Sequence, residues 1–237
     1  MRKYEIRKNS RIKKLFLGVL VLCMGAVLLA GCGSKPEKEQ TEAEETESSG
    51  KEEDKIQIGL TVDSFVIERW IRDRDVFVAT ARELGADVNV QDAGADANEQ
   101  ISQIEYFISK QVDVIVVIAR DCGVLSDAIQ KAHSAGIPVI SYDRMINNAN
   151  TDFYISFDNR KVGEIMAQAL IDALPQGGDI FMIQGPLSDN NVHMLKDGFD
   201  DTIKNTNLNV VYEANCDGWT AVSYTHLRAH ETAANLV

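Results

Sequence analysis

The sequence predicts an α/β protein made of two doubly wound parallel-sheet lobes, the second of which is incomplete. Three observations support this fold class. From residue 56 onward, short apolar segments with strand character alternate with amphipathic helical segments. The same layout starts again after residue 157, but the second series contains only two strand segments. Strands that alternate with helices form parallel sheets with right-handed crossovers.

The first series occupies residues 56–157, which we expect to form an N-terminal lobe. Apolar residues of segment 97–110 recur at helical spacing, and Gly136 with Pro138 ends the last helix. Segment 114–118 is a run of β-branched residues, as in a strand covered on both faces. The expected strands are 56–62, 87–91, 114–118, 139–142 and 153–157, and the expected helices are 68–84, 97–110 and 123–135.

The second series, residues 158–220, is expected to form a partial C-terminal lobe. An apolar stripe runs along 162–174, and a second helix is predicted at 191–205, with strands at 179–183 and 209–213. A parallel sheet of two strands cannot bury both of its faces, so we expect this lobe to lack part of its sheet. Two similar lobes in succession predict a ligand cleft between them, at the carboxyl ends of their strands.

The tail, residues 221–237, continues neither pattern. Its segment VSYTHLRAHET, residues 222–232, matches in one frame the translation of a transposase-type sequencing-library adapter. We therefore interpret the tail as foreign sequence on a truncated fragment. On this interpretation the i, i+4 pair His226 and His230 is not a metal site.

The amino end predicts export and acylation. Seven Lys and Arg residues precede an apolar run at 15–30, which is shorter than the roughly 20 residues that span a bilayer. The run ends in Leu-Ala-Gly-Cys, which resembles a bacterial lipobox. We expect residues 1–31 to be a lipoprotein signal peptide and Cys32 to be lipidated, which would tether the protein to the outer face of the cytoplasmic membrane. The alternative is an ordinary membrane anchor with a chance cysteine.

Charge and composition indicate a disordered segment and argue against nucleic-acid binding and against a cysteine metal site. Segment 32–55 is acidic, lacks large apolar residues from Ser34 onward, and is expected to be a disordered tether. Residues 32–220 carry 16 basic and 34 acidic side chains, a net charge of −18, which argues against a nucleic-acid partner. The two remaining cysteines, Cys122 and Cys216, are interpreted as unlinked thiols in preference to a disulfide, and they do not have the spacing of a metal site.

The chain shows no arrangement typical of an enzyme. A GxGxxG loop after the first strand, a P-loop and a GxSxG elbow are all missing from the sequence. Segment 92–98 (DAGADAN) has the wrong residue order for a calcium loop and is better interpreted as a surface turn. We therefore expect no catalytic residue, no cofactor and no metal.

Polar and aromatic residues instead collect just after strand ends, where they should face the cleft. Asp, Asn and Arg present paired hydrogen-bonding groups that match vicinal hydroxyls of a sugar, and an aromatic face can cover its C–H surface. The candidate ligand-binding residues are Asp63, Arg69, Trp70, Asp143, Arg144, Asp189, Asn191 and Trp219.

Each candidate also has a plainer explanation. Trp70 lies near a helix start and fits the hydrophobic core, and Arg69 fits a surface position. Asp143 and Arg144 fit a turn stabilised by an ion pair. The segment 189–191 fits a helix N-cap.

The stretch from Leu60 to Asp200 resembles bacterial D-xylose-binding proteins, the substrate-binding components of ABC sugar importers. The matching segments are ERW at 68–70, RDRD at 72–75, SQIE at 102–105, DRMIN at 143–147, DFYISFDN at 152–159, KVGE at 161–164, PQG at 175–177, DNN at 189–191 and DGW at 217–219. The resemblance implies the two-lobed fold of periplasmic binding proteins of type I, with sugar bound between the lobes. It also implies that no bond is made or broken.

The resemblance implies pentose contacts from Arg69, Arg144, Asp189 and Asn191, with Asp143 beside them, and stacking faces from Trp70 and Trp219. The remaining sugar ligands of the family come from later in the chain and have no counterpart here. The loop of residues 120–123 (RDCG) is more charged than the resemblance leads one to expect.

The implied function is capture of a monosaccharide, D-xylose or a related pentose, by hinge closure about segments such as 153–157, and its delivery to an ABC permease. We expect a monomer, lipid-anchored on the extracytoplasmic side. The alternative is a sugar sensor that signals to a membrane receptor kinase. An enzyme is disfavoured by the missing phosphate loop, and a repressor by the lipobox in place of a helix-turn-helix.

Overall fold

The computed structural model describes residues 55–226. These residues do not include the predicted signal peptide, the predicted acylation site Cys32, nearly all of the predicted acidic tether, or most of the tail with His230. The strands are β1 (Ile56–Val62), β2 (Ala86–Asp92), β3 (Val114–Ile118), β4 (Val139–Tyr142), β5 (Phe153–Ile155), β6 (Gly178–Gln184) and β7 (Leu208–Asn215). The helices are α1 (Glu68–Glu83), α2 (Ala97–Ser109), α3 (Ser126–Ser134), α4 (Asn159–Ala173) and α5 (Asn190–Ile203). Within this part of the chain, no helix is long and apolar enough to cross a membrane.

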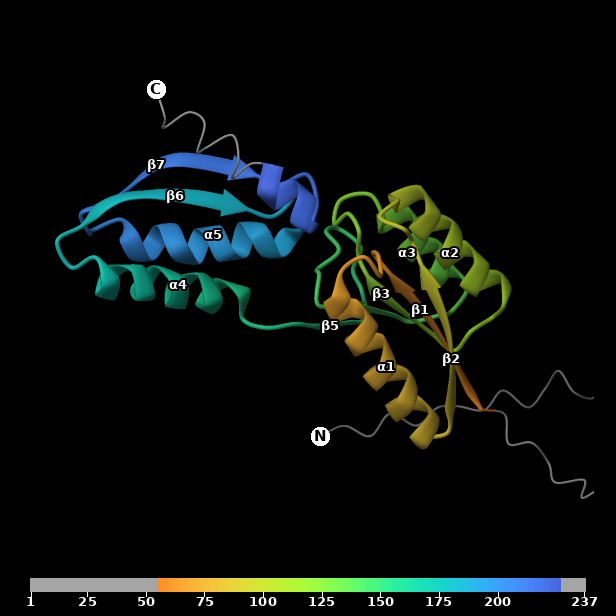
Figure 1. Cartoon of the computed structure of the whole chain (residues 1–237). Coiled ribbons are helices and arrows are strands. Elements are labelled where there is room, and N and C mark those ends of the chain that lie inside the picture. Colours follow the sequence, from red (N-terminus) through yellow and green to blue (C-terminus); the bar gives the residue numbers. More distant parts are fainter. Residues whose placement is uncertain (1–54, 227–237) are drawn as a thin grey trace, which may run out of the picture. The chain divides into compact units, whose positions relative to one another are not determined.

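The first five strands form one parallel sheet in the order β2-β1-β3-β4-β5 (Figure 1). Strand β1 lies between β2 and β3, and its Leu60 pairs with Val90 on one side and Val116 on the other. The parallel α/β architecture predicted for this lobe is confirmed. All five strands point the same way, so their carboxyl ends meet at one edge of the sheet.

Helices cover both faces of this sheet, and β3 shows why. Ile115 and Val117 belong to a buried cluster that includes α2 and α3, whereas their neighbours Val116 and Ile118 belong to the cluster that includes α1. Successive residues of a strand point to opposite faces, so an unbroken β-branched run is what a strand between two helical layers requires. Figure 1 shows α1 on one side of the sheet and α2 with α3 on the other.

Strands β6 and β7 form a second parallel sheet of two strands, as predicted. Their covered face packs on α4 and α5 around Ala167, Phe199 and Leu208. Phe181 and Val211 on these strands remain about half exposed. A two-stranded sheet with one helical layer therefore leaves apolar surface uncovered, which is the expected consequence of an unfinished parallel sheet.

Helices α4 and α5 touch backbone to backbone at two glycines. A Cβ atom on Gly163 would lie 2.0 Å from the carbonyl oxygen of Leu195, and one on Gly198 would lie 2.1 Å from that of Arg160. No side chain fits at either position. This close approach holds the two helices side by side.

Several element boundaries differ from the prediction by one to three residues, and two of these differences have a visible cause. Helix α3 begins at Ser126 instead of 123, because the Asp121 carboxylate accepts a hydrogen bond from the Gly123 N–H (2.8 Å) and closes a turn there. Strand β5 ends at Ile155 instead of 157, because Asp158 caps α4 by accepting from the Lys161 N–H.

Two smaller expectations can also be compared with the structure. Segment 92–98 forms a turn into α2, and Asp96 caps that helix by accepting from the backbone of Asn98 and Glu99. Cys122 and Cys216 are buried free thiols, as the favoured interpretation stated.

Candidate functional site

The loop after β4 places the two central residues of the site. Asp143 adopts a positive φ of 64°, which Asp tolerates better than most residues, and its N–H donates to the Ile155 carbonyl (2.7 Å). The Arg144 N–H donates to the Tyr142 carbonyl (2.8 Å). This tight turn fixes both residues at the carboxyl edge of the first sheet, and their side chains then take different partners.

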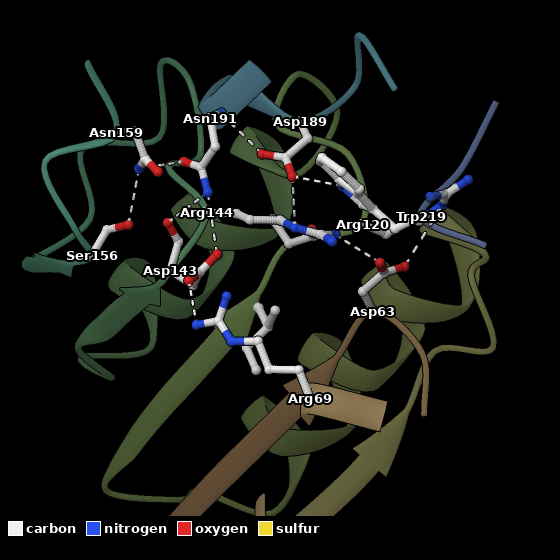
Figure 2. Close-up of polar contacts among 12 residues, drawn as sticks. Asp63, Arg69, Arg120, Asp143, Arg144, Ser156, Asn159, Asp189, Asn191 and Trp219 are labelled. Atoms are coloured by element: carbon white, nitrogen blue, oxygen red, sulfur yellow. Dashed lines mark hydrogen bonds and ion pairs between the residues drawn. The ribbon is translucent and has the colours of Figure 1, made fainter. Parts of the chain in front are cut away.

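Arg144 is 3% exposed and connects three segments (Figure 2). Its Nη1 donates to Asp63 Oδ2 (2.7 Å) after β1 and to the Ala119 carbonyl (2.9 Å) after β3. Its Nε forms an ion pair with Asp189 Oδ2 (2.9 Å) at the start of α5. A buried guanidinium is tolerated because carboxylates and a carbonyl replace the water that it loses.

Asp143, like Arg144, connects side chains from different segments of the chain. Its Oδ2 accepts from Arg69 Nη2 (2.6 Å) in α1, and its Oδ1 accepts from Asn191 Nδ2 (3.2 Å) in α5. Burial lowers the pKa of Arg69, but the hydrogen bond and charge of Asp143 outweigh burial and raise the pKa above its usual value. Arg69 therefore stays charged at every physiological pH.

Asp189 serves the helix and the site together. Its Oδ1 accepts from the Asn191 N–H (2.9 Å) and caps α5. Its Oδ2 accepts from the indole Nε1 of Trp219 (2.9 Å) and faces Arg144. The N-cap explanation is thus confirmed, and the same carboxylate also holds a guanidinium and an indole.

Trp70 belongs to the core and borders the site. It is 2% exposed and packs in the cluster of Leu60 and Val62, as the plainer explanation held. The guanidinium carbons of Arg69 and Arg144 lie 4.4 and 5.4 Å from its ring centre, within cation–π range. Its indole nitrogen is buried without a hydrogen-bond partner among the described residues.

The carboxylates of this cluster are paired with guanidinium groups, and Asp73 also lies 3.4 Å from Arg69. Three carboxylates, Asp63, Asp143 and Asp189, face the guanidinium groups of Arg69, Arg144 and Arg120, the last of which lies 3.8 Å from Asp63. Each carboxylate has a guanidinium partner, which leaves little to attract a metal ion. Carboxylate and guanidinium groups, each with two hydrogen-bonding atoms side by side, suit an uncharged ligand with many hydroxyl groups.

Comparison with known proteins agrees with this fold. Residues 58–227 match the family described as "Periplasmic binding protein domain". The chain belongs to this family. Two D-xylose-binding periplasmic proteins are similar to it: one from Haemophilus influenzae is 41% identical over 79% of this chain, and one from Escherichia coli is 42% identical over 76%.

The matches with these two periplasmic binding proteins span 58% and 56% of their lengths. A solved structure from Clostridium phytofermentans, described as an ABC transporter solute binding protein with bound β-D-glucose, is 28% identical with a TM-score of 0.60. It matches 62% of this chain and 48% of its own. The chain thus covers only part of the complete fold of this family.

All eight side chains expected at the ligand site of this periplasmic binding protein lie in or beside one contiguous cluster, and all of them except Trp70 are labelled in Figure 2. Arg69 lies at the surface, as its plainer explanation stated, with 42% of its side chain exposed, and it also forms an ion pair with Asp143. Asp143 and Arg144 pair with other residues and not with each other.

A ligand cleft was predicted between the lobes. In this structure, polar side chains of the two lobes form an ion pair and a hydrogen bond with each other at that place. A cavity of about 650 Å³ lies in the second lobe, against β6 and α5, and Trp219 alone among the eight candidate residues lines it. Each lobe contributes one acid: Asp189 of the second lobe faces the Arg144 guanidinium of the first, and Asp143 of the first lobe faces the Asn191 amide of the second.

Sequence reasoning missed three residues of the site. Arg120 stands beside Asp63, and its only signal was the unexpected charge of its loop. Asn159 donates to Asn191 Oδ1 (3.1 Å) and lay inside a quoted segment without an assigned role. Gly185 lies under the Trp219 ring, where a Cβ atom would approach to 2.3 Å.

Proposed function

We propose that this protein captures a neutral monosaccharide, D-xylose or a related pentose, on the extracytoplasmic side of a bacterial membrane and delivers it to an ABC permease. The observation that carries the proposal is the placement of Arg144, buried between Asp63 of the first lobe and Asp189 of the second. A site in which a guanidinium group pairs with carboxylates from both lobes is suited to a ligand that contacts both lobes. The similarity to proteins named for D-xylose binding favours a pentose.

The mechanism follows from the hydrogen bonds. Carboxylates of Asp143 and Asp189 accept from sugar hydroxyls, and the Arg69, Arg144 and Asn191 groups donate to sugar oxygens. The indole of Trp219, held by Asp189, covers the apolar C–H face of the ring. Each sugar hydroxyl replaces a side-chain pair that already exists, so binding exchanges hydrogen bonds and does not leave buried groups unpaired.

Closure is the signal that the permease would recognise. The chain passes from one lobe to the other after β5, between Ile155 and the start of α4. A sugar that contacts both lobes stabilises the closed form by its differential affinity for that form. No covalent step is involved, and the protein acts as a monomeric binding component held at the membrane through Cys32.

The proposal is tested with the product of the complete gene, by thermal unfolding and isothermal titration with D-xylose, L-arabinose, D-ribose and D-glucose. Ligand linkage predicts a rise in melting temperature with the bound sugar, equivalent to about 2.7 kcal/mol at 100 times Kd. A protein that shows neither a shift nor heat with any pentose or hexose would refute the function.

A further inference from the structure

Asp63 is a buried carboxylate, and Arg144 donates a hydrogen bond to only one of its two oxygens. It is 1% exposed, and its Oδ2 accepts from Arg144 Nη1 at 2.7 Å. Its Oδ1 is buried with no hydrogen-bond partner among the described residues. A buried carboxylate oxygen without a donor is costly, so a nearby positive charge matters there.

Arg120 supplies that charge. Its Nε lies 3.8 Å from Asp63 Oδ1 and donates a hydrogen bond to the Ala95 carbonyl (3.0 Å). Figure 2 shows Arg120 and Arg144 on opposite sides of Asp63. The carboxylate therefore sits between two guanidinium groups, one of which also engages Asp189 in the second lobe.

A buried network fixes the backbone of Arg120. Its N–H donates to Gln100 Oε1 (2.8 Å), and Gln100 Nε2 donates to the Ile118 carbonyl (3.0 Å) and to Thr61 Oγ1 (3.2 Å). Thr61 Oγ1 donates onward to Gln103 Oε1 (2.7 Å). Gln100 and Thr61 are fully buried, so the position of Arg120 is set before any ligand arrives.

We propose that Arg120 is a positioning residue of the ligand site, which holds Asp63 so that Asp63 aligns Arg144 for the sugar. The inference rests on the proposed sugar-binding function. In this role the positive charge of Arg120 attracts the Asp63 carboxylate, and Arg120 itself does not contact the ligand. We therefore expect substitutions at positions 120 and 63 to have non-additive effects on the ligand dissociation constant.

The test is a double-mutant cycle on the complete gene product, with D-xylose affinity measured by titration. Arg120→Gln should weaken binding about tenfold, in the range expected for a charge next to a buried partner. In the Asp63→Asn background the same change should alter Kd by less than about twofold, because its target charge is gone. Arg120→Lys keeps the charge and should stay within about threefold of the wild type.

Arg82→Gln removes an exposed guanidinium from the last turn of α1 and serves as the control, with wild-type affinity expected. An Arg120→Gln effect that persists undiminished in the Asp63→Asn background overturns the positioning role. If Asp63→Asn does not fold, the lysine variant decides, and affinity as weak as that of Arg120→Gln overturns the inference. A wild type that binds no sugar overturns the function itself, whereas a binding wild type with an unaffected Arg120→Gln overturns only the role of Arg120.

Discussion

Arg144 and Asp189 form an ion pair in which both side chains are at most 4% exposed and the Nε–Oδ2 distance is 2.9 Å. Arg144 comes from the loop after β4, and Asp189 caps α5, so this pair joins the two lobes. The cap ties the carboxylate to a helix that Gly163 and Gly198 hold against α4. The position of the Asp189 carboxylate, a proposed sugar contact, is thus set by the packing of α5 on α4.

Replacing Arg144 should damage stability and binding together. Arg144→Gln leaves Asp63 and Asp189 buried without their shared cation, which typically costs about 3–5 kcal/mol of unfolding free energy. Chemical denaturation and D-xylose titration measure the two effects. Arg72→Gln, which removes an exposed ion pair with Glu68, should change stability by less than about 1 kcal/mol. Equal stability of the two variants would contradict the buried bridge.

The indole of Trp219 depends on the absence of a side chain at position 185. In Gly185→Ala the new Cβ atom would lie 2.3 Å from Trp219 Cζ2, so the ring must move away from its place beside Asp189. We expect roughly a tenfold loss of pentose affinity, in line with the ~1 kcal/mol that an aromatic contact contributes. Titration measures this loss. Gly218→Ala has open space around its Cβ and should bind like the wild type.

The parallel sheet of the first lobe and the gathering of the eight candidate residues could be predicted because parallel strands bring their carboxyl ends together, wherever the residues stand in the sequence. The partners that each site side chain takes in hydrogen bonds and ion pairs could not be predicted in the same way. Asp143 and Arg144 are neighbours in sequence, yet the positive φ of Asp143 gives them separate partners. Arg120 was missed because its role depends on Gln100, 20 residues earlier, which no periodic pattern links to it.

The glycine contact between α4 and α5 should be intolerant of a methyl group. Gly198→Ala gains about 1 kcal/mol of helix propensity, but its Cβ would lie 2.1 Å from the Arg160 carbonyl, and backbone cannot move aside cheaply. We expect a net loss of about 1–3 kcal/mol, the usual range for an overfilled contact. Denaturation midpoints measure it. Gly178→Ala meets only an ordinary contact at 3.8 Å and should lose less.

Lipidation at Cys32 is tested chemically, because an uncleaved signal peptide would also sediment with membranes. Cells grown with an alkyne-tagged fatty acid should incorporate the label into the wild-type protein and not into Cys32→Ser. Cys23→Ser, which changes a cysteine inside the predicted signal peptide, should keep the label. Labelling of Cys32→Ser would show that the anchor, if any, lies elsewhere.

Asp152 gives a pH-dependent contribution to stability at the entrance to β5. Its Oδ2 accepts from the Val139 N–H (2.8 Å) and contacts His133 Nε2 (2.9 Å). The Val139 hydrogen bond, against a smaller opposing effect of burial and with help from His133, lowers the pKa of Asp152 below its usual value. The ionised form therefore stabilises the folded state above the ordinary carboxyl pKa of about 3.9, and this contribution disappears as pH falls through the lower folded-state value.

We expect Asp152→Ala to reduce the unfolding free energy by about 1 kcal/mol at pH 7, the typical contribution of one such hydrogen bond. Denaturant titrations from pH 7 down to about pH 3.5 should show the gap between wild type and variant narrowing below about pH 4, as the wild-type carboxylate gains its proton. Asp172→Ala, an exposed position on α4, should show no such gap. A gap that widens as pH falls below about 4, where the carboxyl group itself gains its proton, would mean that the fold prefers the protonated form of Asp152.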